Sequence, residues 1–130
     1  MSRIPPVLRP EHPAPRPLVD LLTTVPAAVH GALESVAVTG VTLSTGDLHP
    51  GDLFVGVRGE HRHGAEFAAD AVAKGAVAVM TDAAGLALSD GCGVPVLVVE
   101  DPRAALGAVS AWVYRTLDER PLLFGVTGTN

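Results

Sequence analysis

The chain has 130 residues, which is enough for one domain with a buried core. Its formal net charge of -5, without any Lys/Arg cluster, argues against a nucleic acid or an anionic membrane surface as partner. We find no apolar run long enough to cross a membrane and no signal-peptide pattern at the N-terminus. Because Cys92 is the only cysteine, an internal disulfide is impossible, and we expect a cytoplasmic location.

Proline content and apolar spacing predict the first elements. Residues 1–17 hold six of the eleven prolines, which predicts a flexible tail. Apolar residues at helical spacing predict a helix over Leu18–Val25. A β-branched run predicts a strand over Val36–Leu43, with Gly40 as a candidate bulge. A polar loop at 44–52, a strand at Leu53–Val57 and a second polar loop at 58–64 complete this half.

Helices dominate the second half. One helix is expected to end at Gly75. Its predicted inner face consists of Phe67, Ala68, Ala71 and Val72. Residues 82–93 predict a short helix broken near Gly85. The clearest helix follows Asp101, whose carboxylate can accept hydrogen bonds from first-turn amides, and Pro102 suits its first position.

Strands are expected between these helices, at Ala76–Met80, Val94–Glu100 and Pro121–Val126. From residue 53 onward, strands therefore alternate with helices. This alternation predicts an α/β fold with a mixed, partly parallel sheet flanked by helices.

Three polar segments follow predicted strands and are candidate binding sites. The first offers the hydroxyls of Ser44 and Thr45, and the second, "GEHRHG", offers His61, Arg62 and His63 between two glycines. The third is the glycine turn in "GVTGTN", whose amides could face a phosphate. Each segment alone is better explained as an ordinary loop, and a metal site at the two histidines lacks further ligands.

Together these segments resemble the Mur ligase family. "VTGVTLSTGDLHPGDLFVGVRGEHRHGAEFAADAVAKGAVAVM" and "VPVLVVEDPRAALGAVSAWVYRTL" are similar to the N-terminal domain of these ligases, and "GVTGTN" is similar to the start of their ATP loop. The resemblance implies that residues 18–117 form a domain that binds the UDP part of the substrate. Residues 118–130 would be the first strand and the start of the phosphate loop of an ATP-binding domain that is cut short.

The resemblance also implies an activity. Mur ligases are ATP-dependent, amide-forming enzymes of peptidoglycan biosynthesis, which serves cell shape and cell division. "DPRAALG" and "GVTGTN" are most similar to members that add the third amino acid, diaminopimelate or lysine, to UDP-MurNAc-L-Ala-D-Glu. Members that add D-Ala-D-Ala are one alternative, and a stand-alone nucleotide-binding module is another. ATP and Mg²⁺ would serve the whole enzyme, whereas this chain alone is expected to be an inactive monomer without bound cofactor.

Site residues follow from the resemblance, position by position. The UDP contacts fall on Leu43, Ser44 and Thr45 in the first loop and on Glu60, His61 and Arg62 in the second, where Arg62 offers a cation for the diphosphate. The ATP contacts fall on Thr127, Gly128, Thr129 and Asn130, and no catalytic or metal-binding residue is expected in this stretch. The chain departs from the family at Ser44–Gly46, where Asp-Ser-Arg is common, and at His63, where Asp is common.

Overall fold

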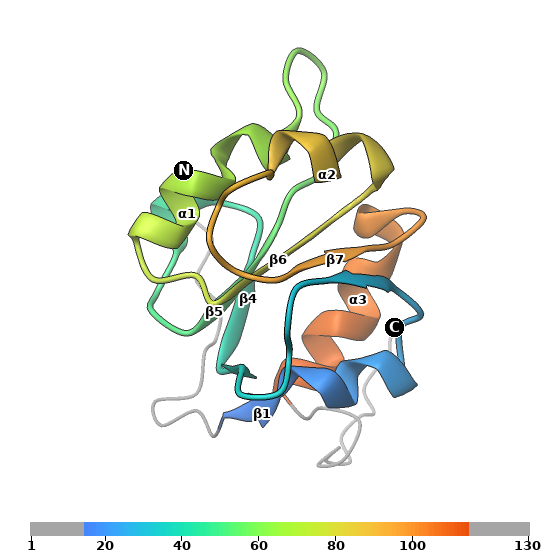
Figure 1. Cartoon of the computed structure of the whole chain (residues 1–130). Helices are drawn as coiled ribbons and strands as arrows, with labels where there is room; N and C mark the ends of the chain where they lie inside the picture. Colours follow the sequence, from blue (N-terminus) through green and yellow to red (C-terminus); the bar gives the residue numbers. More distant parts are fainter. Residues whose placement is uncertain (1–14, 115–130) are drawn as a thin grey trace, which may run out of the picture.

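A five-stranded sheet forms the centre of the computed structural model, which describes residues 15–114 (Figure 1). In spatial order its strands are β2 (Ala28–His30), β7 (Val96–Val98), β6 (Ala78–Thr81), β5 (Asp52–Val55) and β4 (Gly40–Thr42). β4, β5, β6 and β7 pair in parallel, and β2 pairs antiparallel with β7 at one edge. The mixed, partly parallel sheet predicted from the sequence is therefore confirmed.

Helices cover both faces of this sheet (Figure 1). One face carries α1 (Ala68–Ala73), which continues from the 3-10 turn η3 (Gly64–Phe67), and α2 (Ala83–Leu88). The other face carries α3 (Pro102–Tyr114) and the 3-10 helix η1 (Leu18–Thr23). The result is a three-layer α/β arrangement.

Side chains of the central strands alternate between two cores, as the period of a strand requires. Leu53 and Val55 of β5 belong to the core under α3, which contains Trp112. Phe54, between them, belongs to the core under α1, which contains Ala71. Strands buried on both faces are typical of parallel sheets, and this explains their nearly continuous apolar sequence.

α3 begins and ends as local chemistry dictates. The Asp101 carboxylate accepts a hydrogen bond from the Ala104 amide at 3.2 Å, which confirms the predicted cap in front of Pro102. At the other end, the Val41 amide donates to the Tyr114 hydroxyl at 3.2 Å. α3 therefore fastens β4, the other edge strand, to the body of the sheet.

The N-terminal region differs from the sequence-based expectation. Residues 16 and 17, assigned to the tail, form β1 (Arg16–Pro17), which pairs antiparallel with β3 (Ala37–Val38). The expected single strand over 36–43 is wrong, because the chain changes partner at Thr39, from β1 to β5. The apolar spacing at 18–25 produces a 3-10 helix, and β2 was not anticipated at all.

Two predictions for the helices also fail. Gly85 does not break its helix but lies inside α2. Glycine is required at this position because a Cβ would meet the Thr81 hydroxyl and would lie 2.8 Å from the His63 ring. Phe67 does not join the buried helix face, since its side chain is 37% exposed. The α-helix begins only at Ala68, and Phe67 belongs to the 3-10 turn before it, so it does not continue the helical face.

The expected strand over 121–126 and the four predicted ATP contacts lie outside the described residues. Within residues 15–114, no helix is long and apolar enough to cross a membrane.

Candidate functional site

Both predicted UDP loops leave the sheet at the carboxyl ends of its parallel strands, which we call the carboxyl edge. The first loop (residues 43–47) follows β4, and the second loop (residues 58–63) follows β5. β4 and β5 are neighbouring parallel strands with Thr42 opposite Phe54, so their carboxyl ends lie together. Open α/β sheets bind ligands at this edge.

The first loop is a short 3-10 turn with one unused hydroxyl. Ser44 caps the turn by accepting a hydrogen bond from the Gly46 amide at 3.1 Å. The Thr45 carbonyl accepts a hydrogen bond from Lys74 Nζ at 3.3 Å, which ties the loop to the end of α1. The Thr45 hydroxyl has no hydrogen bond to another residue of 15–114, and Leu43 is exposed. Thr45 can therefore donate to a ligand.

The second loop is a tight hairpin that projects beyond α1 and α2 (Figure 1). The Gly59 amide donates to the Arg62 carbonyl at 2.8 Å, and the Gly64 amide donates to the Val57 carbonyl at 2.8 Å. Glu60, His61 and Arg62 are exposed at its tip. A Cβ at Gly59 would lie 2.8 Å from the Arg62 carbonyl, so this close turn requires glycine.

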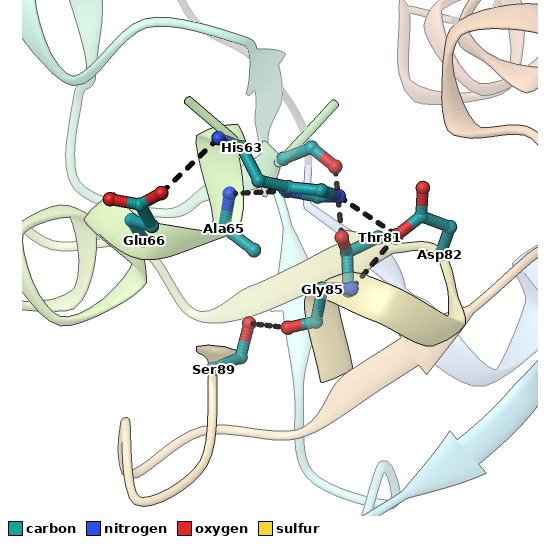
Figure 2. A network of polar contacts seen from close by, with 8 residues as sticks. His63, Ala65, Glu66, Thr81, Asp82, Gly85 and Ser89 are labelled. Carbon is teal, nitrogen blue, oxygen red and sulfur yellow. Dashed lines mark hydrogen bonds and ion pairs between the residues drawn. The ribbon is translucent and has the colours of Figure 1, made fainter. Parts of the chain in front are cut away.

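His63 anchors the base of this hairpin (Figure 2). Its Nδ1 accepts a hydrogen bond from the Ala65 amide at 3.0 Å, and the Glu66 carboxylate accepts one from the His63 amide at 3.3 Å. This reciprocal pair is a capping box, with histidine in place of the usual serine or threonine. The His63 and Glu66 side chains therefore fix the junction between the loop and η3.

The same His63 ring reaches α2. Its Nε2 lies 2.8 Å from Oδ1 of Asp82, which also accepts a hydrogen bond from the Gly85 amide at 2.8 Å (Figure 2). Since Nδ1 accepts from Ala65, the ring proton is assigned to Nε2, which donates to Asp82. Only 8% of the His63 side chain is exposed. The loop is thus held by a partly buried contact between two helical segments.

The environment lowers the pKa of the Asp82 carboxyl. Burial by itself would raise this pKa, because it disfavours the charged form. The hydrogen bonds from the Gly85 amide and from His63, together with the positive charge of Arg58, outweigh the effect of burial. Asp82 therefore stays ionised as the acceptor for both groups.

Arg62 is held by two neighbours of its own. Its guanidinium lies 3.3 Å from Oε1 of Glu66 and 5.4 Å from the centre of the Phe67 ring. The Arg62 side chain is 65% exposed in spite of these contacts. The predicted cation is present at the loop tip, with its orientation restricted.

Two open cavities among the described residues bear on the position of the site. One, of about 610 Å³, lies at the carboxyl edge beside the second loop and is lined by Arg58, Asp82 and the start of α3. A larger one, of about 830 Å³, lies at the opposite edge, beside Cys92 and the end of β2. We relate the smaller cavity to function, because it shares an edge with both predicted loops. No group of three or more potential metal ligands occurs within residues 15–114.

Comparison with known proteins gives a consistent result. The family model described as "Mur ligase family, catalytic domain" matches residues 37–114. The chain belongs to the Mur ligase family. The UDP-N-acetylmuramyl-tripeptide synthetase of Leifsonia xyli is 53% identical over 97% of this chain and 24% of that protein. The UDP-N-acetylmuramoyl-L-alanyl-D-glutamate–2,6-diaminopimelate ligase of Streptomyces avermitilis is 39% identical over 94% of this chain and 24% of that protein.

Solved structures of the family share the fold. A crystal structure of MurF from Acinetobacter baumannii aligns with a TM-score of 0.66 and 22% identity, over 83% of this chain and 22% of that chain. At this identity the likeness concerns the fold alone. The chain spans about a quarter of the length of the curated relatives that it matches.

In this Mur ligase chain, sequence reasoning located the loops but missed what holds them. From the sequence alone, His63 was interpreted as one of two loop histidines and as a departure from the family, and Asp82 was not singled out. The spacing of His63 and Glu66, which is that of a capping box, was an available signal. The contact between His63 and Asp82 joins residues 19 apart, and no local pattern predicts it.

Proposed function

We propose that this chain is the uridine-nucleotide-binding part of a ligase that adds the third amino acid to UDP-MurNAc-L-Ala-D-Glu. The observation that carries the proposal is the placement of the two loops at one edge of the parallel sheet. The family's UDP contacts correspond to Leu43, Ser44 and Thr45 in one loop and to Glu60–Arg62 in the other. The relatives named as tripeptide synthetase and diaminopimelate ligase support this choice.

The loops offer complementary chemistry to a uridine diphosphate. The Thr45 hydroxyl is available to donate to a ribose or phosphate oxygen. The exposed hairpin tip presents backbone amides together with the side chains of Glu60 and His61. Domain 18–117 would hold the nucleotide, and residues 118–130 would begin an ATP-binding domain in which Thr127–Asn130 contact phosphate.

ATP and Mg²⁺ would supply activation of the substrate carboxylate in the whole enzyme. This stretch would contribute substrate binding and positioning in the cytoplasm, as part of peptidoglycan synthesis. A ligase that adds D-Ala-D-Ala is the second candidate. It is favoured only by structures at 22% identity, whereas the relative with the tripeptide synthetase name is 53% identical.

A matched pair of threonine variants tests the proposed site. Thr45→Val removes a hydroxyl at the loop and keeps the shape of the side chain. It should weaken UDP binding by about two- to tenfold, the value of one hydrogen bond. Thr23→Val removes an exposed hydroxyl in η1 that donates to the Asp20 carbonyl, and it should leave binding unchanged. Calorimetric titration of both variants and of the unaltered chain measures the difference.

The same titration tests whether the site prefers a uridine nucleotide. The proposal expects UDP and UDP-MurNAc-L-Ala-D-Glu to bind more tightly than ADP, because phosphate attraction alone would accept any nucleotide. Equal affinity for ADP and UDP, or equal effects of the two variants, would contradict the assignment.

A further inference from the structure

Phe67 is an exposed aromatic side chain that the predicted site does not use. Its side chain is 37% exposed, although the apolar spacing around it predicts burial. Aromatic residues are scarce in this chain, at 4%, so an exposed ring beside a predicted nucleotide loop is a specific feature. Exposed aromatic rings and arginine planes are the surfaces on which proteins stack nucleobases.

Arg62 from the second loop lies over this ring. The distance from the guanidinium carbon to the ring centre is 5.4 Å, and the Glu66 carboxylate holds the same guanidinium at 3.3 Å. Glu66 is itself fixed, because it accepts the hydrogen bond from the His63 amide. The loop tip thus carries an arginine whose planar group is restrained by an ion pair and a ring, while 65% of its side chain stays open to solvent.

α1 lies between Phe67, which contacts Arg62 of the second loop, and Lys74, which contacts the first loop. Lys74 Nζ donates to the Thr45 carbonyl of the first loop at 3.3 Å. Phe67 and Lys74 are separated by about 10 Å along the helix axis. A nucleoside diphosphate is of similar length, so with the base at Phe67 its ribose and phosphates would extend toward the first loop.

We infer that Arg62 and Phe67 form a stacking platform for the uracil base, in which the planar guanidinium of Arg62 stacks on the base. This inference rests on the proposed function and names the residues that hold the base within it. Phe67 lies outside the set of contacts implied by family resemblance, and Arg62 takes a different role from that of a diphosphate cation.

Two conservative variants separate stacking from charge. Phe67→Leu removes the ring and keeps an apolar side chain, and Arg62→Lys keeps the charge and removes the plane. Each should weaken the binding of both uridine and UDP by roughly tenfold, the scale found when a stacking side chain is removed. Neither should change the binding of inorganic diphosphate. Val19→Ala, at an exposed apolar position in η1, is the control and should change none of the three.

The outcomes are distinguishable in titrations of the full chain followed by NMR, with amide dispersion as the check on folding. If Arg62→Lys binds UDP normally, or if either variant weakens diphosphate as much as uridine, the platform is wrong and the proposed function stands. If the unaltered chain fails to bind UDP, the proposed function and the platform are both overturned.

Discussion

At the scale of single residues, the His63 ring joins two segments that the chain brings together from a distance. Nδ1 caps η3 through the Ala65 amide, and Nε2 donates to Asp82 at the start of α2. Gly85 makes room for the ring, since a Cβ there would lie 2.8 Å from Cε1 of His63. One side chain therefore fixes both the loop and its distance from α2.

The Asp82 carboxylate gives this contact a pH dependence. Asp82→Asn keeps an acceptor for the Gly85 amide and removes the charge, so at neutral pH it should destabilise the chain by about 1 kcal/mol. Because folding lowers the pKa of Asp82, the contribution is complete above the ordinary carboxyl range and is lost as pH falls through the lowered value. Urea denaturation at pH 7 and at pH 3 measures the difference between variant and unaltered chain.

Asp90→Asn, at an exposed position after α2, is the matched control and should have little effect at either pH. A penalty for Asp82→Asn that is as large at pH 3 as at pH 7 would show that the charge of Asp82 does not carry the contact.

At the scale of elements, α3 depends on the cap that precedes it. Asp101→Ala removes the acceptor of the Ala104 amide and should lower the free energy of unfolding by about 0.5–2 kcal/mol. Asp101→Asn keeps an acceptor of similar geometry and should cost much less. Chemical denaturation of both variants tests the prediction, and equal losses would indicate that the charge of Asp101, not its capping bond, matters.

Elements with local signals could be predicted from the sequence, and those made by distant partners could not. The cap and apolar face of α3, and the buried runs of β5 and β6, are local features. β2 has three exposed residues and no alternation, so only its pairing with β7 makes it a strand. The break at Thr39 likewise reflects a change of partner strand.

In the candidate site, too, features with a local sequence signal could be predicted and those that depend on distant or irregular structure could not. The two loops could be placed because each follows a predicted strand, and parallel neighbours bring them to one edge. Phe67 is exposed and belongs to a 3-10 turn, which apolar spacing does not reveal. The four predicted ATP contacts stay predictions.

At the scale of the whole molecule, the sheet presents its carboxyl edge as the ligand-binding edge. Both loops, the cavity beside Arg58 and Asp82, and the start of α3 lie there. The larger cavity near Cys92 lies at the opposite edge. We therefore predict one nucleotide site, at the carboxyl ends of the parallel strands, with the Cys92 region outside it.

The most direct test of this central claim is an NMR titration of the chain with UDP, with ADP as the comparison. UDP should shift the amides of residues 43–47 and 58–67, leave those of residues 89–95 unchanged, and exceed ADP in effect at equal concentration. Shifts that centre on residues 89–95, or that are as strong with ADP as with UDP, would contradict the account.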